Sequence, residues 1–168
     1  MKVVELKQYP QAHTSAPPSA YVLPHTVDPK DTGALQQMLG SDTATFRSLH
    51  QYQVYHTLQV PGHVILNVAA TGSGKTLPYQ LLMYTASSPA TSVMIVPYNV
   101  LHGEMLRCHE GLGLSVARYD RNQPFPSNKK IVLVSLETLG QGNKLYDEVS
   151  QLAASGKLKC IAIDEARM

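Results

Sequence analysis

The run of residues 69–76 places the strongest constraint on how this chain can fold. It reads Ala-Ala-Thr-Gly-Ser-Gly-Lys-Thr and matches the phosphate-binding pattern Gly, four residues, Gly-Lys-Ser/Thr except at its first position, which is Ala69. Glycines at positions 72 and 74 let backbone N–H groups converge on phosphate oxygens, because no side chain blocks the approach. Such a loop requires a strand before it and a helix after it.

The segments on either side of the run meet that requirement. Residues 63–68 follow the turn Pro61-Gly62 and are rich in β-forming residues, and Leu77 to Tyr84 is apolar enough to pack as a helix. A flexible glycine loop that contains a lysine by chance would not need such neighbours. We therefore expect a nucleotide site whose phosphate cradle is formed by four consecutive loop residues: Thr71, Gly72, Ser73 and Gly74.

Two side chains of the run would contact the nucleotide and its metal directly. Lys75 would bring a cation to the β- and γ-phosphates. The Thr76 hydroxyl would ligate the Mg²⁺ that accompanies a nucleoside triphosphate.

The chain downstream of the run alternates between apolar strands and amphipathic helices. Strands are predicted at residues 92–96, 114–119, 131–134 and 159–163, and helices at residues 99–111 and 144–154. This alternation predicts right-handed βαβ crossovers and the α/β fold class, with a doubly wound parallel sheet.

The beginning of the chain has a different composition. Five of the eleven prolines fall in the first thirty residues, which disfavours a long helix or a central strand there: Pro10, Pro17, Pro18, Pro24 and Pro29. We expect residues 1–45 to be an extended or disordered lead-in, with a short helix at residues 31–39, and residues 46–168 to form the domain. A helix at residues 46–58 would open that domain.

Length, charge and cysteine content limit the class of protein further. A chain of 168 residues with 43% hydrophobic content fits one domain, and its two cysteines lack the spacing of a zinc module or disulfide framework. A net charge of +2 means that nucleic acid would have to contact local patches such as Lys129-Lys130. No signal-peptide pattern or membrane-length apolar run occurs, which predicts an intracellular protein, nuclear or cytoplasmic, without a membrane partner.

Two carboxylates follow the last predicted strand. Asp164 and Glu165 lie at the carboxyl end of a buried strand, which is where parallel sheets bind ligands. There Asp164 would hold Mg²⁺ through water, and Glu165 would orient or deprotonate an attacking water. The alternative is that the pair caps a following helix, but its occurrence with the phosphate-binding run favours the hydrolytic interpretation.

Five segments together resemble the motor core of RecQ-like DNA helicases of the DEAD/DEAH-box class in superfamily two. They occur in the family's order and spacing: Phe46-Arg47-Ser48-Leu49-His50-Gln51, residues 69–76, Val96-Pro97-Tyr98-Asn99-Val100-Leu101, Val134-Ser135-Leu136-Glu137 and Asp164-Glu165-Ala166. The similarity covers about residues 46–168 and looks closest to RecQ-like sequences common in fungal genomes. It implies a RecA-like P-loop NTPase lobe, the first of two, that uses ATP and Mg²⁺ and translocates on single-stranded DNA.

The resemblance also assigns roles to residues that the composition does not single out. Arg47 and Gln51 would read the adenine, although a solvated helix face is the alternative interpretation of these two side chains. Residues 97–101 and 135–137 would lie along the single-stranded DNA backbone. Four tyrosines could stack on bases, but at these spacings they would more often fill the core: Tyr79, Tyr84, Tyr98 and Tyr119.

The chain departs from the family at several positions. Arg167 stands where the family usually has histidine, Leu136 replaces a proline, and the chain stops before the next motif and the second lobe with its arginine finger. We therefore expect an incomplete domain that is marginally stable and hydrolyses ATP slowly, unless another chain supplies the second lobe. A remnant that binds nucleotide without helicase activity is the alternative, whereas a P-loop kinase would require glycine at position 69 and an arginine-bearing lid.

Overall fold

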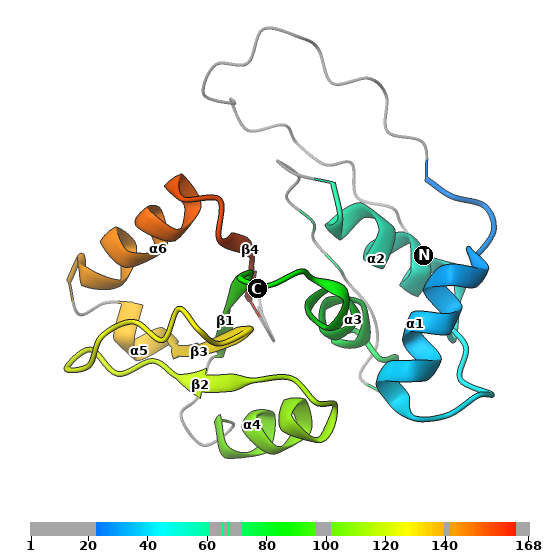
Figure 1. Ribbon diagram of the computed structural model, residues 1–168, viewed down its shortest axis with the longest axis horizontal. Coiled ribbons are helices and arrows are strands. Elements are labelled where there is room, and N and C mark those ends of the chain that lie inside the picture. The colour runs from blue at the N-terminus through cyan, green and yellow to red at the C-terminus, as the bar shows by residue number, and fades with distance from the viewer. Residues whose placement is uncertain are drawn as a thin grey trace, which may run out of the picture.

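Strand β1 (Thr91–Val96) lies at the centre of a parallel sheet, and all six of its residues are buried. In the computed structural model, which describes residues 23–60, 65, 67, 72–96, 102–139 and 142–163, β1 pairs with β3 (Ile131–Ser135) and β4 (Leu158–Ile163). Strand β2 (Val116–Arg118) pairs with the other side of β3, which gives the order β2-β3-β1-β4 (Figure 1). The predicted α/β class and the parallel sheet are confirmed.

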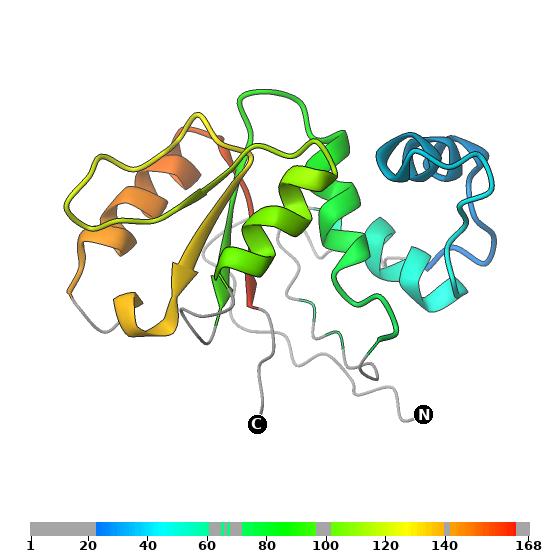
Figure 2. The same ribbon diagram turned by 90° about the horizontal axis from the view of Figure 1, so that it is seen from below.

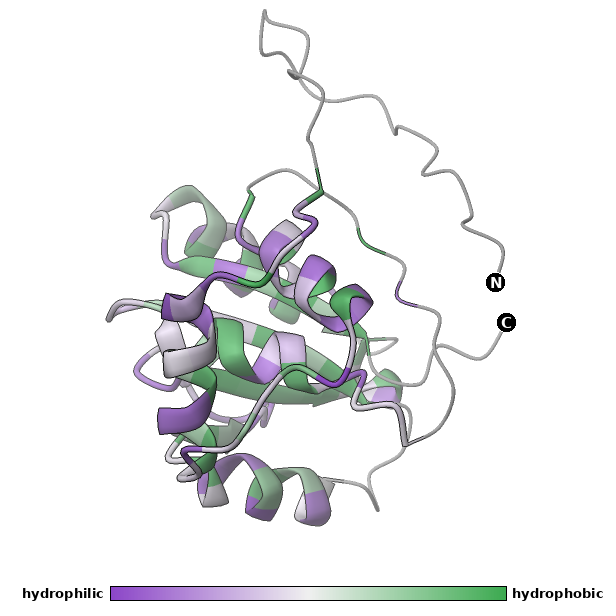
Figure 3. Ribbon diagram, turned by 90° about the vertical axis from the view of Figure 1, so that its right-hand side faces the viewer, coloured by the Kyte–Doolittle hydropathy of each residue, from purple (hydrophilic) through white to green (hydrophobic). Residues whose placement is uncertain are grey.

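Helices cover both faces of this sheet because its strands are apolar on both sides (Figure 2). Helices α3 (Leu77–Thr85) and α4 (His102–Gly111) pack on the face that includes Met94 and Leu133. Helix α6 (Lys144–Ala154) packs on the opposite face through Leu145. In Figure 3 the hydrophobic colour (green) is concentrated along the strands, while the helices carry both hydrophobic and hydrophilic residues, as this layering requires.

Two further helices form a third layer on the outer side of α3. Helix α1 (Pro29–Leu39) contributes buried Leu35 and Met38, and α2 (Leu49–Leu58) contributes two buried tyrosines to the same cluster. Asp28 caps α1 by accepting a hydrogen bond from the N–H of Lys30, and the hydroxyl of Tyr52 in α2 donates to Asp31 in α1. This part of the predicted lead-in is therefore helical and packed, while the domain boundary at residue 45 stays a prediction.

Most predicted elements appear with shifted ends. The helix expected at residues 46–58 begins at Leu49 because Ser48 caps it, and the strand expected at residues 114–119 is shortened to β2. Helix α5 (Leu136–Leu139) is a single turn after β3 that the sequence did not predict. The strand expected at residues 63–68 lies largely outside the described residues.

Strand β4 is the edge strand of the described sheet on the side of β1. Its residues alternate between half-buried and exposed, and Ile161 and Ile163 are 52% and 60% exposed. Whether this edge makes the chain marginally stable, as expected above, stays a prediction. Among the helices of the described residues, none has the length and apolar character needed to cross a membrane.

Lys130 fixes the direction of α3 relative to the sheet. It immediately precedes β3, and its ammonium donates to the carbonyls of Met83, Tyr84 and Ala86 at the end of α3, at 3.0, 3.0 and 3.3 Å. Burial lowers the pKa of this ammonium from its ordinary value. The end of α3 therefore lies at the amino edge of the sheet, and its first turn lies at the carboxyl edge. Of the two lysines that the sequence offered as a local patch for nucleic acid, Lys130 therefore makes its hydrogen bonds within the protein.

We expect Lys130→Met to lower the free energy of unfolding by about 1–2 kcal/mol, because three terminal carbonyls of α3 lose a cationic donor. Urea denaturation followed by circular dichroism measures this change. Lys129→Met is the matched control, since it removes the same charge one residue earlier. An equal loss in both variants would mean that the carbonyl contacts do not stabilise the fold.

Candidate nucleotide site at the start of helix α3

The loop Gly72–Thr76 leads into α3 at the carboxyl edge of the sheet. Gly72 and Gly74 have φ angles of +77° and +75°, which lie in the left-handed region that side chains rarely adopt. The N–H of Leu77 donates to the carbonyl of Gly74 at 3.1 Å, so the loop turns directly into the helix. Both positions therefore have a backbone conformation that favours glycine, while the binding of phosphate by this loop stays a prediction.

Arg47 and Gln51 reach this loop from the start of α2. A guanidinium nitrogen of Arg47, Nη1, donates to the carbonyl of Gly72 at 3.0 Å, and Gln51 Nε2 donates to the carbonyl of Gly74 at 3.0 Å. Gln51 is 5% exposed, and its Oε1 accepts from the backbone N–H of Arg47 at 2.9 Å. The two residues singled out by the resemblance thus meet at the predicted loop.

These contacts bear on the expected role of Gln51. Both ends of its amide are bonded within the protein, so pairing with an adenine would require the amide to exchange those bonds. Arg47 is exposed, and the contact of its side chain with the loop is to a carbonyl. Adenine recognition by the pair stays a prediction, and support of the loop is the role that their contacts define.

A cavity of about 400 Å³ opens beside the loop. Four predicted site residues line it: Arg47, Gln51, Gly74 and Thr76. Several further lining residues were not predicted for this site. They come from α3, α4 and the segment before α2: Thr45, Gln80, Glu104 and Cys108. Of these, only Gln80 carried a usable signal, because it lies one helical turn after Thr76.

Lys75 and Thr76 lie between the two positive-φ glycines and the first turn of α3. Lys75 is exposed, so its ammonium is accessible to an anion. Thr76 precedes the first residue of α3, yet its hydroxyl makes no capping hydrogen bond to the helix. That these two residues contact a nucleoside triphosphate and its Mg²⁺ stays a prediction from the sequence.

Several predicted site residues lie outside the described part of the chain. They are Thr71, Asp164 and Glu165, together with residues 97–101 of the expected DNA path. Ser135 is buried at the end of β3, and its hydroxyl pairs with that of Thr138 at 2.7 Å. Among the described residues, no three histidine, cysteine or acidic side chains gather in a group that could hold a metal ion.

The tyrosines and histidine of the core are placed by packing. Tyr79 and Tyr119 are 6% and 5% exposed, so the expectation that they fill the core is confirmed for these two. Tyr84 is half-buried against the same core, and Tyr98 lies outside the described residues. Burial raises the pKa of Tyr79 well above its ordinary value. His109 is fully buried, and its Nδ1 lies 2.6 Å from the carbonyl oxygen of Met105 in the same helix.

Comparison with protein families and with curated proteins adds no relative to this description. No protein-family model matches the chain, and no curated protein matches it. The interpretation of the site therefore depends on the loop residues and on the contacts that surround them.

Gly74→Ala is expected to lower the free energy of unfolding by about 1 kcal/mol more than Gly72→Ala. Both changes force a side chain into a positive φ, but a Cβ at position 74 would lie 2.7 Å from Gln51 Nε2, while a Cβ at position 72 would meet nothing within 4 Å. The extra loss reflects displacement of the Gln51 amide from its hydrogen bonds. Thermal and urea denaturation of both variants measure it.

A double-mutant cycle separates this contact from backbone strain. In a Gln51→Ala background, the two glycine substitutions should cost the same, because the amide that distinguishes them is gone. A difference that persists there would show that Gln51 is not its cause.

Proposed function

We propose that this chain is the nucleotide-binding lobe of an ATP-dependent motor on nucleic acid, similar to the first RecA-like lobe of a RecQ-like DNA helicase. The observation that carries the proposal is the convergence of Arg47 and Gln51 on the loop Gly72–Thr76. A phosphate-binding sequence alone is a weak signal. A phosphate-binding sequence at the start of a helix, at the carboxyl edge of a parallel sheet and beside a cavity, is a stronger one.

Each part of the loop would have a separate task toward ATP. The backbone between Gly72 and Thr76 would supply N–H donors to phosphate oxygens, and Lys75 would neutralise their charge. Thr76 would ligate Mg²⁺ together with Asp164, and this ion would supply charge neutralisation at the reacting phosphates. Arg47 and Gln51 would hold the loop in the shape that the phosphates require.

A second candidate function is nucleotide binding without coupled motor activity. It is favoured by Arg167, which replaces the histidine usual in the family after the acidic pair, and by Leu136 in the segment expected to follow DNA. Both functions require the same loop. They differ in whether single-stranded DNA changes the rate of ATP hydrolysis.

Lys75→Ala tests the loop in either case. We expect it to weaken binding of a fluorescent ATP analogue by about tenfold or more, because a charge-assisted contact to the phosphates is lost. Lys157→Ala is the matched control, since this exposed lysine immediately precedes β4 and so lies where the strands begin, at the opposite end of the strands from the loop. Equal affinity in wild type and Lys75→Ala would overturn the proposed nucleotide site.

ATP turnover with and without single-stranded DNA then separates the two functions. A motor lobe should hydrolyse ATP slowly and be stimulated by DNA, and Lys75→Ala should abolish both activities. Nucleotide binding with no turnover under either condition would instead assign the chain to the second function. A phosphate-release assay measures both rates.

A further inference from the structure

The cavity beside the loop Gly72–Thr76 has apolar walls and a balanced charge. Leu39 at the end of α1 is 40% exposed, so part of its apolar surface is open to a ligand. The charged side chains that line the cavity are one arginine and one glutamate, Arg47 and Glu104. A charge-balanced cavity with apolar walls suits the uncharged part of a nucleotide better than its phosphates. Its apolar lining side chains come from α1, α3 and α4: Leu39, Leu77 and Met105.

The amide closest to the loop is already bonded at both ends. Gln51 donates to the carbonyl of Gly74 and accepts from the backbone N–H of Arg47. An amide that pairs with a base needs its donor and its acceptor at the same time. A base that enters the cavity therefore needs a partner other than Gln51.

Gln80 brings a second amide to the same cavity. It lies in α3 one helical turn after Thr76, it lines the cavity, and it is 7% exposed. Its Nε2 donates to Cys108 Sγ at 3.7 Å, and among the described residues this thiol is its only side-chain partner. Sulfur is a weak acceptor, so a ligand that offers oxygen or nitrogen would readily replace it.

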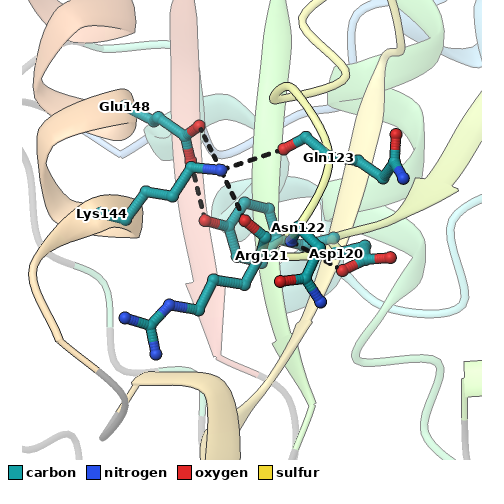
Figure 4. Close-up of polar contacts among 7 residues, drawn as sticks. Asp120, Arg121, Asn122, Gln123, Lys144 and Glu148 are labelled. Carbon is teal, nitrogen blue, oxygen red and sulfur yellow. Dashed lines mark hydrogen bonds and ion pairs between the residues drawn. The ribbon is translucent and has the colours of Figure 1, made fainter.

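Side-chain nitrogens in other parts of the described structure bind oxygen instead. Figure 4 shows an example beside α6, where the ammonium of Lys144 donates to the carbonyls of Arg121 and Gln123 and lies 3.8 Å from a carboxylate oxygen of Glu148. Lys130 likewise donates to three carbonyls at the end of α3. By comparison, the buried amide of Gln80 is weakly bonded, and it lies on a cavity wall.

We propose that Gln80 reads the adenine base of the bound nucleotide, an inference that rests on the nucleotide-binding function proposed above. A carboxamide pairs with adenine through two hydrogen bonds, since its NH₂ group donates to N7 and its oxygen accepts from the N6 amino group. Guanine has the acceptor O6 in place of that amino group, so the amide oxygen would face another oxygen. Gln80 would thus determine base specificity without contacting the phosphates.

Titration calorimetry of the full chain with ATP, GTP and inorganic tripolyphosphate tests this role. The wild type should bind ATP about tenfold more tightly than GTP. Gln80→Met keeps a side chain of similar length but removes the amide, so the two affinities should become nearly equal while the affinity for tripolyphosphate stays the same. Gln151→Met is the matched control on the exposed surface of α6, and it should change none of the three.

The two cysteines give a second measurement that needs no variant. Cys108 is exposed and lines the cavity, whereas Cys160 is half-buried in β4, where burial raises the pKa of its thiol. Saturating ATP should slow the modification of Cys108 by N-ethylmaleimide severalfold, because the base would cover the thiol. Saturating tripolyphosphate should not slow it. Peptide mass spectrometry follows both cysteines, and Cys160 should react at the same rate throughout.

The role of Gln80 would be overturned if the wild type bound ATP and GTP equally, if Gln80→Met kept the wild-type ratio, or if Gln151→Met changed it as much. Equal modification of Cys108 with ATP and with tripolyphosphate would overturn it as well, even if Gln80→Met did not fold. In each of these cases, binding of tripolyphosphate by the wild type would leave the proposed nucleotide loop intact. If the wild type bound neither tripolyphosphate nor ATP, the nucleotide site itself would be wrong and the role of Gln80 would fail with it.

Discussion

The parallel pairing of β1 with a strand on each side is the constraint on which the rest of the structure depends. β1 has a paired strand on each side and apolar side chains on both faces, so helices must cover the sheet above and below to bury those side chains. Because all four strands run the same way, every loop that follows a strand opens at one edge. The loop Gly72–Thr76 lies at that same edge because Lys130 holds the other end of α3 at the opposite, amino edge.

The layer formed by α1 and α2 supports the loop that precedes α3. The two helices pack against α3 through a cluster that includes Leu35 and Tyr55. Gln51 of α2 and Arg47, which lies just before this helix, then contact the loop before α3. Lys130 holds the other end of the same helix. Helix α3 is therefore positioned at both ends by residues from outside it, which would place the loop before it accurately in the proposed phosphate-binding role.

The sequence predicted those parts of the fold that depend on local patterns. Residues 92–96 and 131–134 are continuous apolar runs, which can be buried only in a strand that has helices on both faces of its sheet. Helix α6 has the predicted bounds because its amphipathic run stops at Gly156. Contacts between distant residues were not visible. Lys130 binds carbonyls 44 to 47 residues earlier in the chain, and Gln51 meets a carbonyl 23 residues away, so neither contact has a local signature.

The contact between Gln51 and Gly74 also limits how this sequence can change over evolutionary time. The amide of Gln51 occupies the space where a side chain at position 74 would begin. Gly74 can therefore be replaced by a larger residue only after Gln51 has been replaced by a shorter side chain or has changed its conformation. Even then, the new side chain at position 74 would be strained by the positive φ. Substitutions at positions 51 and 74 should therefore be correlated among related sequences. A change at position 51 that precedes one at position 74 would show that the hydrogen bond from Gln51 to the loop was lost before the loop sequence changed.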